Sequence, residues 1–163
     1  MDFKYYKKYI KRCIRIAEYA LDSGELPHGS IIVKNNKIIS EAGNQVRKDR
    51  NILQHAEIVA LIKAQKILSL NELKKCTIYS TFEPCPMCAF AIRELKLKKV
   101  VFSIPSPIMG GYSKWDILQD GELNKKFPKY FGAPPKIIKK VLRDEALKTW
   151  KKREILKENG LAI

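Results

Sequence analysis

The chain has 163 residues, a length that suits one domain with a sizeable core. Hydrophobic residues make up 45% of it and charged residues 30%, an ordinary soluble globular composition. No apolar stretch approaches the roughly 20 residues needed to cross a bilayer, and the N-terminus lacks the apolar core and cleavage site of a signal peptide. We therefore expect a cytoplasmic protein with no membrane segment.

Positive charge is in large surplus. There are 32 Lys+Arg against 17 Asp+Glu, a formal net charge of +15. A surplus of this size favours contact with an anionic partner such as RNA, DNA or a nucleotide. The net charge does not distinguish between RNA, DNA and a nucleotide as the partner.

Helical and strand patterns alternate along the first half of the chain. Apolar residues recur three or four positions apart from Phe3 to Leu21, which predicts an amphipathic helix. The segment DSGELPHG breaks this pattern. Two β-branched runs around Asn35-Asn36 then predict a hairpin. After a polar, loop-like segment, helical spacing returns from His55 to about Leu68.

The second half continues this alternation. CTIYSTF (76–82) and KKVVFSI (98–104) are strand-like, and PMCAFAIREL (86–95) between them predicts a helix. A Pro/Gly-rich stretch and a polar segment ending in GAPP follow. From about residue 136 the chain is expected to form one basic C-terminal helix. Strands that alternate with helices after a hairpin suggest one domain over 1–163, with a mixed sheet covered on both faces.

Two predicted helix beginnings carry residues that a helix start does not need. Cys85 and Cys88 are three apart, so a first helical turn places both sulfurs on one side, the geometry of a zinc chelate. The partial positive charge of a helix start also favours thiolates. His55 can supply a third ligand, which leaves one tetrahedral position for water, as in catalytic zinc sites. Glu57 can then take the proton that zinc makes labile.

Each part of this pattern also has a plainer interpretation. C-x-x-C occurs in redox pairs and in structural zinc knuckles, but a redox pair comes without His-x-Glu, and Cys13 and Cys76 do not form the second pair of a knuckle. His55 alone would be a helix-start histidine, and Glu57 alone an ordinary first-turn acid. Together, H-x-E followed by P-C-x-x-C matches the zinc-deaminase signature in order and content.

On these residues the sequence resembles the cytidine-deaminase superfamily. HAEIVAL (55–61) and TFEPCPMCAFAI (81–92) are most similar to the branch of tRNA adenosine deaminases, guanine deaminases and yeast-type cytosine deaminase. The likeness extends from about Tyr5 to Ile104 and weakly into the last helix. It implies a three-layer α/β/α sandwich around a mixed sheet of about five strands, and a homodimer. YFGAPPKII (130–138) is a poor candidate for the fifth strand.

The resemblance also implies roles for the residues of the motif. His55, Cys85 and Cys88 would bind Zn²⁺. Glu57 would take a proton from the attacking water and return it to the ring nitrogen. A second proton delivery would then release ammonia and leave a carbonyl.

Five further residues are considered for the substrate pocket. Asn44 stands where the family often has an asparagine that contacts the base, although a turn residue is also expected there. Glu83 would mainly place the backbone of the pocket wall. His28, where relatives carry an apolar residue, either lines the pocket or is an exposed loop histidine, and we prefer the second. Trp115 and Tyr112 either stack on a base or anchor an irregular loop to the core, the better expectation for aromatics.

Three functions are consistent with these residues. The preferred one is deamination of a free nucleobase or nucleoside, because SPIMGGYSKWDIL (106–118) departs from the pattern of the tRNA enzymes. The second is deamination of adenosine in a tRNA anticodon loop, supported by twelve Lys/Arg against three acidic residues over 124–157 and by a basic first helix. The third is a zinc-stabilised nucleic-acid-binding module without turnover, in which Glu57 would have no use.

Overall fold

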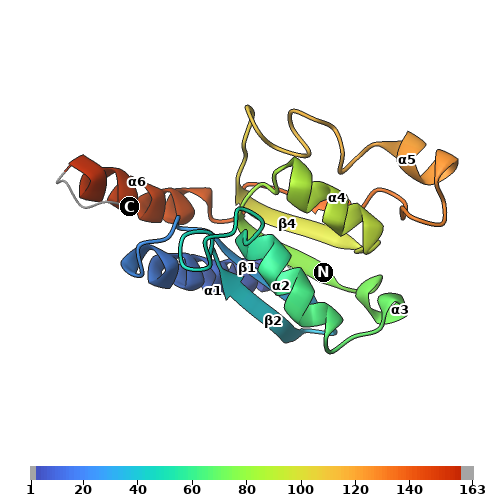
Figure 1. The fold of residues 1–163 in the computed structure, drawn as a ribbon, viewed down its shortest axis with the longest axis horizontal. Coiled ribbons are helices and arrows are strands. Elements are labelled where there is room, and N and C mark those ends of the chain that lie inside the picture. The colour runs from blue at the N-terminus through green and yellow to red at the C-terminus, as the bar shows by residue number, and fades with distance from the viewer. Residues whose placement is uncertain (1–2, 159–163) are drawn as a thin grey trace.

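A mixed five-stranded sheet lies at the centre of the computed structural model, which describes residues 3–158 (Figure 1). The strand order is β2-β1-β3-β4-β5. β1 pairs antiparallel with β2 and β3, whereas β3, β4 and β5 are parallel. The elements in chain order are α1 Phe3–Asp22, β1 Gly29–Lys34, β2 Lys37–Gly43, α2 Ala56–Gln65, α3 Leu70–Leu73, β3 Thr77–Phe82, α4 Pro86–Glu94, β4 Lys99–Ile104, α5 Gly121–Lys126, β5 Lys136–Ile138 and α6 Arg143–Glu158.

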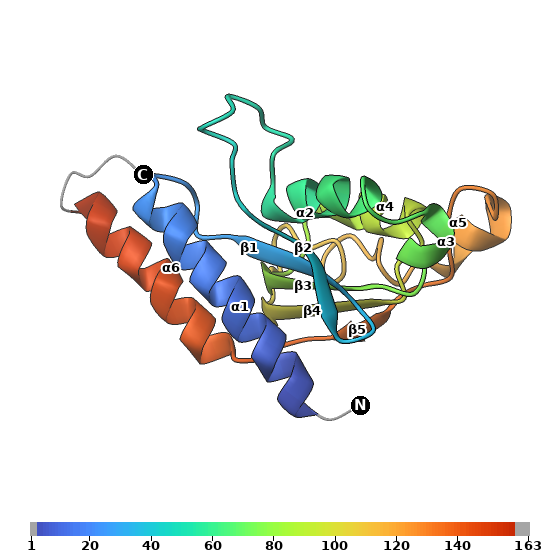
Figure 2. The same ribbon diagram turned by 90° about the horizontal axis from the view of Figure 1, so that it is seen from below.

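Helices cover both faces of the sheet. α2 and α4 lie on one face, and α1 and α6 lie side by side on the other (Figure 2). The expected α/β fold with a mixed five-stranded sheet is therefore confirmed. Within residues 3–158, no helix combines the length and the apolar character that a membrane span requires.

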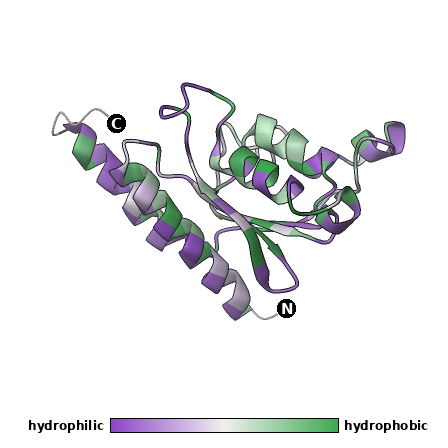
Figure 3. Cartoon of the chain, turned by 60° about the horizontal axis from the view of Figure 1, so that its bottom comes forward, coloured by the Kyte–Doolittle hydropathy of each residue, from purple (hydrophilic) through white to green (hydrophobic). Residues whose placement is uncertain are grey.

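The central strands are apolar on both sides because each side meets helices. Hydrophobic residues accordingly run along the middle of the sheet and hydrophilic residues along its loops (Figure 3). Buried strand residues on the side of α1 and α6 include Ile31, Tyr79 and Val101. Those on the side of α2 and α4 include Ile32, Ile78 and Val100. Two core layers thus hold the sheet between the helices.

The hairpin between β1 and β2 turns at Asn35 and Asn36, as the sequence predicted. Both residues have positive φ, 48° and 61°. Asparagine tolerates this left-handed conformation better than most residues, and tight hairpin turns with two such positions match the twist of the strands. The turn pairs β2 with β1, and β2 lies at one edge of the sheet.

The predicted C-terminal helix from residue 136 was wrong in its first part. Lys136–Ile138 is the edge strand β5, and α6 begins only at Arg143. Ile137 packs against one core layer and Ile138 against the other, which is the alternation of a strand. Lys140 and Leu142 have positive φ, so a continuous helix cannot pass through them. The same three residues supply the fifth strand that the sequence did not reveal.

Arg93 holds the irregular segment between β4 and β5 against α4. The side chain is buried, with 1% exposed. Its Nη1 donates to the carbonyl of Ile117 at 2.6 Å and its Nη2 to the carbonyl of Gly132 at 3.0 Å. Two loop positions that are far apart in sequence are therefore fixed by one guanidinium group.

We predict that Arg93→Ala lowers the free energy of unfolding by about 3 kcal/mol, since it removes two charge-assisted hydrogen bonds and leaves buried carbonyls unpaired. Urea denaturation of both proteins measures this difference. Arg143→Ala is the matched control, because Arg143 is exposed and its ion pair with Asp144, at 3.4 Å, lies on the surface. Equal stability of the two variants would show that Arg93 does not hold the segment.

Candidate active site

Two helix beginnings meet at the end of β3. His55 is the N-cap residue of α2, with extended backbone angles of φ −64° and ψ 148°. Cys85 is the N-cap residue of α4, where Pro86 begins the helix, and Cys88 lies in the first turn. The predicted ligands therefore come from helix starts, where backbone N–H groups favour thiolate sulfur.

The three predicted ligand atoms lie at the separations of a tetrahedral zinc centre. Cys85 Sγ is 3.5 Å and Cys88 Sγ 3.7 Å from His55 Nδ1, and the two sulfurs are 3.7 Å apart. Zn–S bonds of about 2.3 Å and Zn–N bonds of about 2.0 Å at tetrahedral angles require about 3.8 Å between sulfurs and about 3.5 Å from sulfur to nitrogen. The residues therefore fit zinc, with Nδ1 as the histidine donor.

The protonation of this group also suits a cation. The pKa of Cys85 falls to about 4, first because of its hydrogen bond with the Cys88 thiol and then because of its hydrogen bond with His55. The same contact, together with burial, raises the pKa of Cys88. The hydrogen bond to Cys85 raises the pKa of His55. The lowered pKa favours the thiolate of Cys85, the form in which a cysteine binds a metal ion.

Glu57 lies beside this centre without belonging to it. Its side chain is buried, with 5% of the residue exposed, in the first turn of α2. Ser80 Oγ of β3 donates to Oε1 at 2.9 Å, and Oε2 is 3.8 Å from Cys88 Sγ. Burial is the main reason that the pKa of Glu57 is raised. A carboxyl group held in this way can accept and return a proton next to the ligands.

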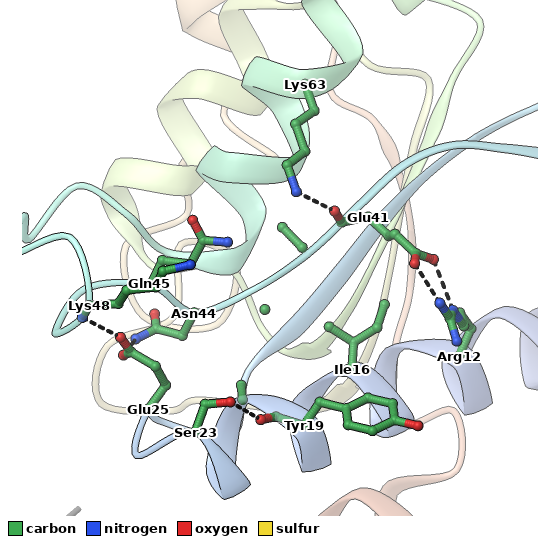
Figure 4. A pocket seen from close by; sticks show the side chains of 13 residues that line it. Arg12, Ile16, Tyr19, Ser23, Glu25, Glu41, Asn44, Gln45, Lys48 and Lys63 are labelled. Carbon is green, nitrogen blue, oxygen red and sulfur yellow. Dashed lines mark hydrogen bonds and ion pairs between the residues drawn. The ribbon is translucent and has the colours of Figure 1, made fainter.

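Asn44 is buried, and its side chain is held by the carboxylate of Glu25. Its Nδ2 donates to Glu25 Oε2 at 2.9 Å, and its backbone N–H donates to the carbonyl of His28 (Figure 4). Glu25 Oε1 also accepts the backbone N–H groups of Arg47 and Lys48. The structure thus fixes Asn44 at the end of β2 through Glu25, and a contact with substrate stays a prediction.

His28 is half-buried, so the preferred expectation of an exposed loop histidine was wrong. Its ring centroid lies 4.7 Å from that of Phe82 and 5.8 Å from that of Trp150. Burial, followed by the nearby His55, lowers the pKa of His28 to about 4, so the imidazole is neutral near pH 7. Trp150 of α6 was missed in the sequence, where it stands among lysines as one residue of a basic helix.

Glu83 holds the backbone of the loop after β4 through its side chain, and a contact with substrate stays a prediction. Its buried carboxylate accepts the backbone N–H groups of Ser106, Tyr112 and Ser113 and the hydroxyl of Ser113, at 2.7 to 3.1 Å. A Cβ atom at Gly110 would collide with this carboxylate, and one at the next residue, Gly111, would collide with Ala89. We call this arrangement the Glu83 clasp.

The two aromatic residues of the same loop, Tyr112 and Trp115, differ in how far they are buried. Tyr112 is half-buried and packs near Phe102, with ring centroids 6.4 Å apart, so it anchors the loop as expected. Trp115 is 57% exposed, with Lys114 Nζ 6.0 Å from its ring. The expectation that Trp115 anchors the loop to the core was therefore wrong. A stacking role on a base stays a prediction.

Known proteins that resemble this chain in sequence include zinc-binding deaminases. The sequence model of a protein family, described as the cytidine and deoxycytidylate deaminase zinc-binding region, matches residues 4–104. The tRNA-specific adenosine deaminase of Aquifex aeolicus (strain VF5) is 38% identical over 119 residues, which are 72% of this chain and 79% of that protein.

Two solved structures resemble the fold. A structure from studies of A-to-I editing by tRNA:A34 deaminases has a TM-score of 0.73 at 23% identity, over 87% of this chain and 98% of that one. The guanine deaminase of Bacillus subtilis has a TM-score of 0.56 at 34% identity, over 60% of this chain and 63% of that one. Fold, ligand geometry and these matches define a zinc-dependent hydrolytic deaminase. The chain belongs to the cytidine and deoxycytidylate deaminase family.

We predict that Cys88→Ser binds zinc at least about 100-fold more weakly than the wild type, since even the loss of a ligand's supporting partner costs 10 to 100-fold. Competition with a chromogenic chelator measures the affinity. Cys76→Ser is the matched control, because Cys76 is a buried cysteine outside the ligand group. If Cys88→Ser keeps the wild-type affinity, Cys88 is not a ligand.

Proposed function

We propose that this deaminase is specific for tRNA and converts an adenosine of the anticodon loop to inosine. The observation that carries the proposal is the 38% identity to a tRNA-specific adenosine deaminase across 79% of that protein. This relative supports an RNA substrate over the free nucleobase or nucleoside that the sequence analysis preferred. The net charge of +15 agrees with a polyanionic substrate. A tRNA substrate also accords with a cytoplasmic location.

In the proposed site, His55 Nδ1 and the sulfurs of Cys85 and Cys88 hold Zn²⁺. When bound, the ion supplies Lewis-acid activation of a water molecule, lowering its pKa from 15.7 to about 7. The lowered pKa of the Cys85 thiol supports this ligand set, because a thiolate is the form of cysteine that binds zinc.

Glu57 is the proposed proton carrier. Ser80 fixes its Oε1, so Oε2 is directed towards the ligand group, 3.8 Å from Cys88 Sγ. Glu57 takes a proton from the attacking water and delivers it to the ring nitrogen next to the carbon that bears the amino group. The second proton of the same water is then transferred to the amino group, which leaves as ammonia, and the oxygen of the water remains as the carbonyl. The raised pKa of the buried carboxyl lets it hold a proton between these steps.

We predict that Glu57→Gln retains its zinc but loses roughly 10³-fold in kcat, because proton transfer by a positioned acid–base group contributes about 10² to 10⁴-fold. Ammonia release and metal content, measured on the same sample, test both parts. Glu94→Gln, an exposed change on α4, is the matched control. Wild-type turnover by Glu57→Gln would exclude Glu57 as the carrier.

The substrate assignment is tested by ammonia release from unmodified tRNA and, in parallel, from free adenine, guanine, cytosine and their nucleosides. We expect turnover of tRNA and none when the anticodon-loop adenosine is replaced by guanosine. The similarity to the guanine deaminase of Bacillus subtilis makes free guanine the second candidate. Turnover of guanine without turnover of tRNA would refute the proposed function and make guanine the substrate.

A homodimer is also part of the proposal. Ile62 of α2 and Phe90 of α4 are each 42% exposed, although both are large apolar residues. Such side chains favour burial against a second copy of the chain. We predict twice the chain mass in sedimentation equilibrium, and a lower dimer affinity for Phe90→Ser. A monomeric wild-type protein at micromolar concentration would contradict this prediction.

A further inference from the structure

Two hollows open along the edge strand β2, and Arg12 lines both of them. The first lies on the outer side of the N-terminal half of α1, next to Ile38 of β2, and its cationic lining residues are Lys4, Lys7, Lys8, Lys11, Arg12 and Arg15. The second continues from Arg12 between α1, β2 and α2, and reaches Asn44, with Lys48 and Lys63 in its wall (Figure 4). We call the two together the β2 groove.

The acidic residues of the β2 groove are already engaged. Glu41 accepts two hydrogen bonds from Arg12, at 2.9 and 2.5 Å. Glu25 is held by Asn44 and by two backbone N–H groups. Their charges therefore do little to offset the other cations.

Four exposed cations of the groove have no such partner. Within residues 3–158, no carboxylate forms an ion pair with Lys7, Lys8, Lys11 or Arg15. They lie on the solvent side of α1, whose opposite side packs on the sheet. Their positive charge is thus available to an anionic partner.

The β2 groove leads from the hairpin to the end of the sheet that carries the ligand group. At its first end, Tyr9 Oη donates to the carbonyl of Asn36 at 2.8 Å and fixes α1 on the hairpin turn. At its other end, Asn44 donates its backbone N–H to His28. The seven residues of β2 span about 23 Å. At about 3.4 Å of helix axis per phosphate along one strand, several phosphates fit beside this strand.

The groove suits a phosphodiester backbone better than a peptide strand. Lys63 Nζ donates to the backbone carbonyl of Glu41 at 3.0 Å, and the side chain of Glu41 forms an ion pair with Arg12. These contacts occupy part of the edge that an added strand would need for hydrogen bonding. Lysine and arginine side chains without acidic partners, in contrast, are the usual contacts of nucleic-acid phosphates.

We propose that the β2 groove binds the phosphodiester backbone of the substrate RNA, beyond the nucleotide that is deaminated. This inference rests on the proposed function, because it takes the polyanion to be the tRNA substrate. The cations of α1 contribute affinity that does not depend on sequence. The catalytic residues lie outside the groove, so the chemistry at the base is separate from this contact.

The test is a groove variant in which Lys7, Lys8, Lys11 and Arg15 are all changed to Gln, a residue of similar helix propensity. The control variant carries the same loss of charge outside the groove, as Lys66→Gln, Lys75→Gln, Lys98→Gln and Lys126→Gln, all at exposed positions. Fluorescence anisotropy measures the Kd of labelled tRNA over a series of salt concentrations. Zinc content and deamination of tRNA at saturating concentration are measured beside it.

We expect the groove variant to bind tRNA at least tenfold more weakly than the control variant. The slope of log Kd against log salt should fall by about 3, as four lost phosphate contacts require. Equal affinities of the two variants, or no binding of tRNA by the wild type, would overturn the inference. Groove-dependent binding without deamination of tRNA would support the inference and refute the proposed function.

Discussion

Strand β3 positions most of the proposed site, because it is buried between an antiparallel and a parallel neighbour and cannot shift along either. Ser80, inside the strand, fixes the carboxylate of Glu57. The residues that follow the strand supply Glu83 for the loop and Cys85 for the ligand group. The register of one strand thus sets the relative positions of proton carrier, ligand and loop.

The charge distribution divides the molecule into two regions. Around the ligand group, buried side chains form hydrogen bonds with one another and alter each other's pKa values. Along α1 the charges are exposed, and those that line the first hollow are all positive. Chemistry at a single base needs the first kind of environment, and long-range attraction of a polyanion needs the second.

Features with local causes could be predicted from the sequence. The hairpin follows from two asparagines that accept positive φ, and the sulfur pair follows from a spacing of three at a helix start. Strand β5 could not be predicted, because its three residues are extended only through their pairing with β4. Nothing local distinguishes KII in a strand from KII in a helix. The contact of His28 with Trp150 depends on the packing of α6 beside the sheet, which joins residues from opposite ends of the chain.

The Glu83 clasp has a consequence for how this enzyme can change. Gly110 and Gly111 have no room for a side chain, and four donors from the loop converge on one carboxylate, so the base of the loop tolerates little substitution. The tip is different, since Ile108 and Met109 are largely exposed. Residues at the tip can therefore be exchanged without disturbing the ligand group, whereas exchanges at the base would break the contacts that hold the loop.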